Sequence, residues 1–255
     1  MLRELYRYRD LIRALVARDL KVRYRRSAIG FLWTMLHPLM TMLVMTFVFS
    51  HIFRADVANF PVYALAGIVF WNFFSQAIVA AMNSLRGNAA LLTKLPVPKA
   101  VFPLATVLSG VVNLVCALVP LFLIMVLTGQ PFSWSLAILP LSIVLAVCMT
   151  LGAGLLLSPL AAFFTDTVEL VTILLTLLMY MTPVFYPVSI LPPDLRWIVE
   201  ANPIRWILDM FRLPIYAGTI PSLTEMAVAT LIALTVLTIG AAVFRATSHR
   251  IAVYL

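Results

Sequence analysis

Charged side chains are scarce in this sequence. Only 11% of its 255 residues are Asp, Glu, Lys or Arg, whereas 63% are hydrophobic. A soluble domain exposes more polar surface than this composition can supply, so the sequence indicates a membrane protein. The net charge of +8 then reads as a signal for membrane topology and as attraction to an anionic lipid surface, and no pattern indicates a nucleic-acid partner.

Patterns for catalysis, metal binding and nucleotide binding are also missing. No P-loop occurs, so the chain does not bind and hydrolyse ATP in the usual way. No Ser lies in a nucleophile-elbow sequence. The two Cys lie singly in apolar segments and the three His are far apart, which indicates neither a disulfide framework nor a metal site. We expect no catalytic residue, metal or cofactor in this chain, and any energy source must be a partner.

Five segments without charge have room for six membrane-spanning helices. A helix needs about 20 apolar residues to cross a hydrocarbon core of roughly 30 Å. The longest segment, 100–165, is interrupted by "TGQPFSW" at Thr128 to Trp134, whose Gly and Pro favour a tight turn. We therefore predict an all-α integral membrane fold, a single domain over residues 1–255, with spans at 30–52, 61–84, 101–127, 136–163, 168–187 and 224–244.

The Lys and Arg residues orient these spans. If both termini lie inside, the inner segments carry 14 of the 18 basic residues, as the positive-inside rule requires. Residues 1–26 add a helical pattern with Leu11 and Leu15 on an apolar half and Arg13 and Lys21 on a basic half. This pattern predicts an interface helix along the inner surface, with its apolar face in the acyl boundary.

Two connections between spans are unusual. The inner loop 86–99, "RGNAALLTKLPVPK", contains a short helix signal, with Asn88 as its cap and Pro96 and Pro98 ending it. The outer connection 188–221 is too long for a simple turn. It predicts two short amphipathic helices that meet at Asn202 and Pro203, in a re-entrant or interfacial position.

Asp166 and Glu169 are the only charges at the edge of the fifth span. Their spacing matches a capping box, which also suits the helix dipole. The alternative is a proton relay, since ion-coupled transporters keep charged side chains inside the membrane. We favour the capping box, because the spans are otherwise almost free of charge.

The order of several stretches resembles the membrane subunits of type-2 ABC exporters that move polysaccharides such as O-antigen, teichoic acid and capsule. The stretches are "RDLKVRYRRSAIGFLWTMLHPLMTMLVMTFVFSHIFR", "LLTKLPVPKAVFPL", "MTPVFYPVSILP" and "NPIRWILDMFR". Together they cover nearly the whole chain in the order of that family. Two departures occur: His37 stands where Asn commonly precedes the Pro, and Thr165 where an Arg often precedes the Asp.

The resemblance implies a homodimer that works with two ATP-binding cassette subunits, which bind the ATP and Mg. Such an exporter moves a lipid-linked polysaccharide through a channel between two permease copies in the bacterial cytoplasmic (inner) membrane, with both termini cytoplasmic. Two alternatives stay open. One is a type-2 ABC permease for a drug or small lipid, and the other is an intramembrane enzyme that acts on lipid-linked sugars.

The resemblance also implies functional surfaces. The basic cluster fixes the orientation and, as a further hypothesis, binds the phosphates of the lipid-linked substrate; it comprises Lys21, Arg23, Arg25 and Arg26. Aromatic side chains either form interfacial belts or line a sugar path; they are Phe31, Trp33, Phe47, Phe49, Tyr180, Phe185 and Tyr186. The inner coupling helix, with leucines otherwise exposed to the cytosol, docks into the ATPase through Asn88, Leu91, Leu92, Lys94 and Leu95. The outer gate contains Trp197, Asn202, Pro203 and Trp206.

Overall fold

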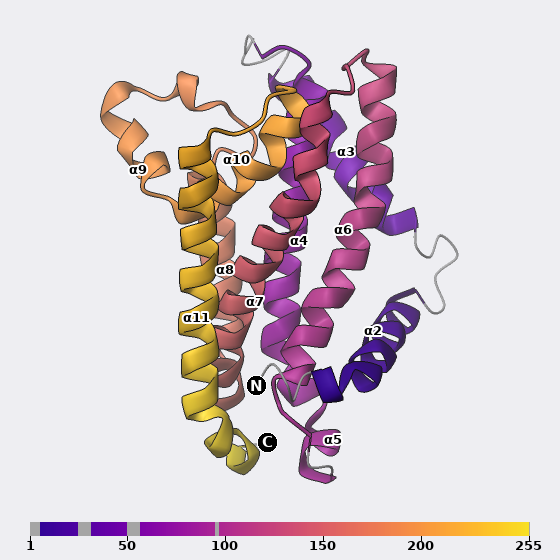
Figure 1. Cartoon of the computed structure of the whole chain (residues 1–255), viewed down its shortest axis with the longest axis vertical. Coiled ribbons are helices and arrows are strands. Elements are labelled where there is room, and N and C mark those ends of the chain that lie inside the picture. Colours follow the sequence, from indigo (N-terminus) through magenta and orange to yellow (C-terminus); the bar gives the residue numbers. More distant parts are fainter. Residues whose placement is uncertain (1–5, 25–31, 50–56, 95–96, 255) are drawn as a thin grey trace.

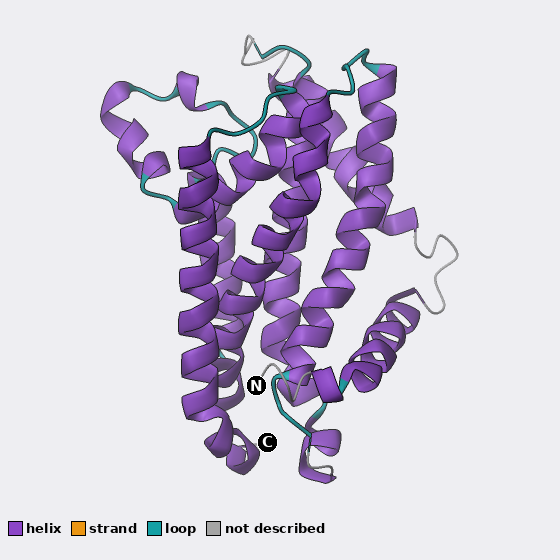
Figure 2. Cartoon of the chain, viewed as in Figure 1, coloured by secondary structure: helices purple, strands orange, loops and turns teal. Residues whose placement is uncertain are grey.

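The computed structural model describes residues 6–24, 32–49, 57–94 and 97–254, and in these ranges every regular element is a helix (Figure 2). Most of the long helices run side by side along the length of the molecule (Figure 1). The interface helix α2 (Arg9–Tyr24), the short helix α5 (Ala89–Lys94) and the end of α11 (Leu223–Tyr254) lie at one end. Helices α9 (Arg196–Glu200) and α10 (Pro203–Tyr216) lie at the other.

Among the described residues, four helices are long and apolar enough to cross a membrane. They are α4 (Phe60–Gly87), α6 (Val101–Leu127), α7 (Leu139–Phe163), which follows a 3-10 turn at Trp134–Ile138, and α11. The second, third and fourth predicted spans are confirmed within a few residues. The sixth begins as predicted but continues ten residues beyond 244, because neither Gly nor Pro follows Gly240 to end the helix.

Two further apolar helices are shorter, with 15 residues each: α3 (Trp33–Phe47) and α8 (Thr167–Met181). The ends of the first predicted span, 30–31 and 50–52, lie outside the described residues. The predicted end of the fifth span at 187 is wrong. Helix α8 stops at Met181 because Pro183 forces the preceding Thr182 into an extended conformation, with φ −97° and ψ 137°. Short 3-10 turns follow at Val188–Ile190 and Pro193–Leu195.

Helix α4 is the centre of the bundle and packs against α3, α6, α7, α8 and α10. Helices α7 and α11 pack over much of their length, and glycine allows this close approach. A Cβ atom added to Gly152 would lie 2.6 Å from the carbonyl carbon of Val236, and one on Gly240 would lie 2.0 Å from the Gly152 oxygen. Small residues at such crossings let helix backbones meet, which is how helices associate in lipid.

The predicted amphipathic helix at the N-terminal end is present as α2, which crosses the bundle at an angle (Figure 1). Its apolar face packs on the protein: Ile12 and Leu15 are buried in a cluster with Leu85 and Phe102 at the ends of α4 and α6. The sequence pattern predicts that this face dips into the acyl boundary. The cluster shows instead that part of it is buried against the bundle, which holds α2 in place.

Candidate functional site

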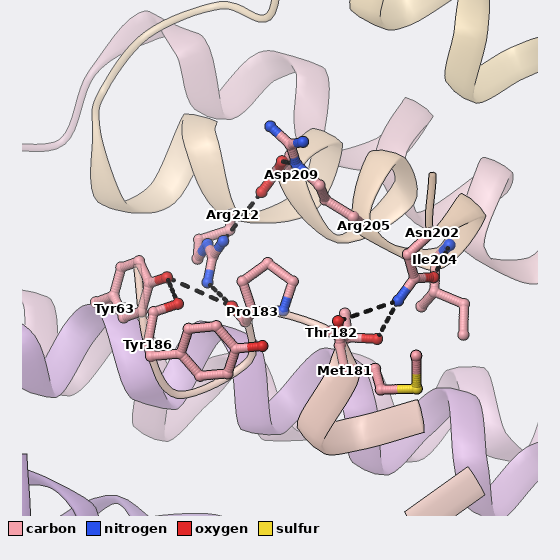
Figure 3. Close-up of polar contacts among 10 residues, drawn as sticks. All are labelled: Tyr63, Met181, Thr182, Pro183, Tyr186, Asn202, Ile204, Arg205, Asp209 and Arg212. Atoms are coloured by element: carbon pink, nitrogen blue, oxygen red, sulfur yellow. Dashed lines mark hydrogen bonds and ion pairs between the residues drawn. The ribbon is translucent and has the colours of Figure 1, made fainter. Parts of the chain in front are cut away.

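The outer connection folds into two short helices that meet at Asn202, as predicted. The Asn202 side-chain oxygen accepts a hydrogen bond from the Ile204 amide at 2.9 Å, and Pro203 occupies the first turn of α10. The Asn202 amide nitrogen also donates to the Thr182 hydroxyl at 2.8 Å (Figure 3). One side chain therefore begins α10 and ties it to the end of α8.

A buried arginine makes a second connection between the same two elements. Arg212 on α10 is only 5% exposed, and it donates to the Pro183 carbonyl at 2.7 Å and to Asp209 at 3.0 Å (Figure 3). Its guanidinium carbon lies 4.2 Å from the centre of the Tyr63 ring on α4. The Tyr63 hydroxyl donates to the Tyr186 carbonyl at 2.8 Å, so α4, α10 and the turn after α8 converge here.

We call this set the outer polar network; its members are Tyr63, Thr182, Pro183, Asn202, Asp209 and Arg212. The outer gate predicted from the sequence includes Asn202 but not Arg212. The spacing of Arg205, Asp209 and Arg212 was a usable signal, since residues three and four apart share one face of a helix. Of the predicted gate tryptophans, Trp197 is 64% exposed, while Trp206 is half-buried with Arg205 above its ring.

The aromatic residues predicted to line a path divide into two groups. Trp33, Phe47 and Tyr180 are more than half exposed. Phe185 is 7% exposed, so its ring is not open to a path in this chain. Phe49 is half-buried and stacks on Phe60, with ring centres 5.1 Å apart. Tyr186 is half-buried and its hydroxyl donates to the Tyr180 carbonyl; Phe31 lies outside the described residues.

Helices α3 and α8 each carry an exposed apolar face. On α3 the face consists of Leu36, Met40, Leu43, Val44 and Phe47. On α8 it consists of Leu170, Ile173, Leu174, Leu177 and Tyr180. Such faces suit contact with lipid or with another apolar protein surface. Both 15-residue helices therefore lie at the outside of the single chain.

At the end of the bundle that carries α2 and α5, the Asn88 side chain does not cap α5, contrary to the prediction. Its side-chain oxygen accepts from Arg18 at 2.8 Å, and its amide nitrogen donates to the Ser84 carbonyl at 2.7 Å. The backbone carbonyl of Asn88 instead accepts the Leu91 and Leu92 amides. The Asn88 side chain therefore connects Arg18 on α2 to the end of α4.

The leucines of α5 are less available than predicted. Leu92 is 8% exposed and belongs to the cluster that holds α2, and Leu91 packs against that cluster. The premise that three leucines face the cytosol is therefore wrong for Leu92. Leu95 and the side chain of Lys94 lie outside the described residues.

The basic residues at this end are only partly described. Lys21 is exposed on α2, whereas the side chain of Arg23 and all of Arg25 and Arg26 lie outside the described residues. Lys99, in the loop before α6, donates to the Ser248 carbonyl near the end of α11, and burial lowers the pKa of its amine. This contact ties the inner loop to α11.

The predicted capping box at α8 is wrong. Asp166 precedes α8 with helical angles, φ −73° and ψ −12°, and its side chain makes no capping hydrogen bond. A capping side chain needs an extended residue to reach back to the helix amides. The Asp166 carboxylate instead accepts from the hydroxyl of Thr165, and Glu169 is exposed.

The family model for the ABC-2 type transporter matches residues 10–216. An O-antigen export system permease protein, RfbA, of Myxococcus xanthus is 33% identical over 87% of this chain and 86% of its own length. RfbA of Klebsiella pneumoniae is 28% identical over 83% of this chain and 82% of its own length. The polysialic acid transport protein KpsM of Escherichia coli is 23% identical over 92% of each chain.

Proposed function

This chain belongs to the ABC-2 type transporter family, and we propose that it is the permease subunit of an ATP-driven exporter of an O-antigen-like or capsular polysaccharide. One observation carries the proposal: its relatives named for polysaccharide export cover more than four fifths of the chain. The sequence has no P-loop, so the ATP, its Mg ion and the hydrolysis belong to separate ATP-binding cassette subunits.

The proposed assembly is a homodimer in the bacterial cytoplasmic membrane with cytoplasmic termini. In it, α3 and α8 cross the bilayer together with the four long helices, which completes six spans. Their exposed apolar faces support this arrangement, because two copies can cover these faces with each other. The polymer path then runs between the copies, past the exposed rings Trp33, Phe47 and Tyr180.

The inner end is the proposed docking surface for the ATPase. Helix α5 protrudes there (Figure 1), and the Arg18 to Asn88 hydrogen bond links it to α2. A Leu91→Asp, Leu92→Asp test is unsuitable, because it would disrupt the buried cluster as well as docking. The charge reversal Lys94→Glu replaces no residue of the described cluster and should reduce co-purification of the ATPase. Arg13→Glu, on the exposed face of α2, is the matched control and should not reduce it.

The basic cluster of Lys21, Arg23, Arg25 and Arg26 is proposed to receive the phosphates of the lipid-linked substrate. Arg fits phosphate in a forked geometry that Lys lacks. The double substitution Arg25→Lys, Arg26→Lys preserves the charge and hence the topology. Reduced export by this variant supports phosphate recognition, and unchanged export leaves the cluster only its role in orientation.

The proposed function is tested by deleting the gene in its own cells and measuring polysaccharide on both sides of the membrane. We expect surface polymer to disappear, polymer to accumulate in the cytoplasm, and the wild-type gene to restore export. Normal surface polymer after deletion, with altered tolerance of a drug or altered lipid composition, would instead support a permease for a small substrate.

A further inference from the structure

A cavity of about 280 Å³ lies between α3, α4 and α6. It is lined by Trp33 and His37 near the start of α3, and by Asn72 and Asn113 near the midpoints of α4 and α6. With the inner end placed as proposed above, the cavity extends from the inner part of the membrane to its middle. It lies on α4 and α6, away from the exposed face of α8.

The lining is unusually polar for this depth. His37, Asn72 and Gln76 all border the cavity, and within the described part of the chain their side chains make no hydrogen bond. An amide placed in hydrocarbon without a partner costs several kcal/mol, so polar groups in spans normally find one. His37 and Gln76 are exposed and Asn72 is half-buried, so their donors and acceptors are open to a polar occupant of the cavity.

The chemistry of the lining selects among polar occupants. Among the residues that the structure describes, no Lys, Arg, Asp or Glu borders the cavity, so no described side chain there balances the charge of a phosphate or an ammonium group. The polar atoms belong to amides, hydroxyls and an imidazole, which match the donors and acceptors of sugar hydroxyls. Two aromatic rings, Trp33 and Phe73, border the same space and can contact the CH faces of a sugar ring.

The size and position of the cavity point to the same occupant. Its volume lies just below the usual range for small-molecule sites, roughly 300–1,000 Å³, which suits a single sugar residue. A second cavity of about 490 Å³ shares Ala80 and Thr106 with it and is bordered by Arg18 and Asp19 on α2. The two cavities together run from the interface helix to the middle of the bundle.

We propose that the α3–α4–α6 cavity is a binding site for one neutral sugar residue of the exported polymer, held by Asn72 and Gln76. The proposal rests on the proposed function, because it takes its ligand from the polymer. It adds an intrachain site on α4 and α6 to the path between copies. A bilayer phospholipid and a second copy of the chain are the competing occupants.

Photocrosslinking in living cells distinguishes these occupants. Ala80 borders the cavity, is half-buried and is not one of the two residues proposed to hold the sugar, so it is the site for the photoreactive residue p-benzoylphenylalanine. Leu231 on the exposed face of α11 is the matched control site. After illumination, the permease is purified and its adducts are treated with periodate, which cleaves sugar diols. We expect a periodate-sensitive glycan adduct from position 80 and none from position 231. A lipid adduct alone, a permease dimer alone, or equal glycan labelling at both positions would overturn the proposal.

A second measurement separates this site from the proposed function. Replacing both amides with leucine, Asn72→Leu and Gln76→Leu, should lower the initial rate of polymer export at least fivefold, since two hydrogen bonds to the sugar are lost. Export by the wild-type chain in the same cells establishes the proposed function independently. If the wild type exports polymer and the double variant, inserted at equal amount, exports at an equal rate, the sugar site is refuted and the exporter remains.

Discussion

Replacing Arg212 with methionine tests the outer polar network. Methionine has a similar length and is apolar, so the change removes the charge and the donors while filling most of the space. Arg212 loses its hydrogen bonds to Pro183 and Asp209 and its position over the Tyr63 ring. Because the Pro183 carbonyl then keeps only a long contact to the Tyr63 hydroxyl, 3.4 Å, a buried acceptor is left poorly satisfied.

The size of the effect follows from these contacts. A hydrogen bond to a charged group contributes about 1.5–3 kcal/mol, and the Asp209 bond contributes less because that carboxylate is partly exposed. The cation–π contact adds about 0.5–2 kcal/mol. With some recovery from methionine packing, we expect a net loss of about 3 kcal/mol, in line with the loss of one partner from a buried pair. For a chain of this size this corresponds to a fall in melting temperature of roughly 6–12 °C.

The assay is the melting temperature of the purified protein in detergent. It is determined from the loss of the monodisperse peak in size-exclusion chromatography as the protein is heated. Arg205→Met is the matched control, because Arg205 lies on the same helix and pairs with the same carboxylate at 3.2 Å but is more exposed. We expect the control to lower the melting temperature by roughly 2–4 °C, for a loss of about 1 kcal/mol. Equal effects of the two substitutions would refute the reasoning that burial makes Arg212 the anchor.

Three further predictions concern the other contacts. Gly152→Val should prevent α7 and α11 from packing and abolish the monodisperse peak, whereas Gly87→Ala, where an added Cβ meets no atom within 4 Å, should not; a normal yield of the valine variant would contradict the close crossing. Asn88→Leu removes the link to Arg18. It should lower the rate of polymer export more than the rate of ATP hydrolysis, so that less polymer is exported per ATP; an unchanged amount of polymer per ATP would show that this link is not used in coupling. In a chain without its two native cysteines, Phe47→Cys combined with Tyr180→Cys should form a disulfide between copies, seen as a dimer band under oxidation, and a disulfide only within one chain would exclude the proposed dimer.

The spans were predictable because uncharged windows are a direct consequence of the bilayer. The long helices α4, α6 and α7 fill those windows, and the turn at Thr128 to Trp134 falls where Gly and Pro allow it. The end of α8 was missed although Pro183 marks it. The hydropathy of this long apolar segment predicts a continuous span. The prediction followed hydropathy and not the backbone rule that the residue before a proline leaves the helix.

The functional contacts were less predictable, because they join residues far apart in the sequence. Asn88 looked like a cap from its neighbours alone, and only the fold brings Arg18, 70 residues earlier, to its side chain. The neighbours of Arg212 in the sequence do not show that it is buried. Only the packing of α10 onto the end of α8 places its guanidinium beside the Pro183 carbonyl. Asn202 was predictable as the meeting point of two helices because it is followed directly by Pro203, and a proline marks such a helix boundary in the sequence itself.

The central claim, ATP-driven export of a polysaccharide through this chain, is tested most directly with inside-out membrane vesicles. The vesicles contain the permease and its ATPase, and radiolabelled lipid-linked polymer is presented on their outer, cytoplasmic face. We predict that ATP makes the label resistant to an added glycosidase, and that vesicles without the permease show no such protection. Label that stays fully accessible to the glycosidase with ATP, permease and ATPase all present would contradict the claim.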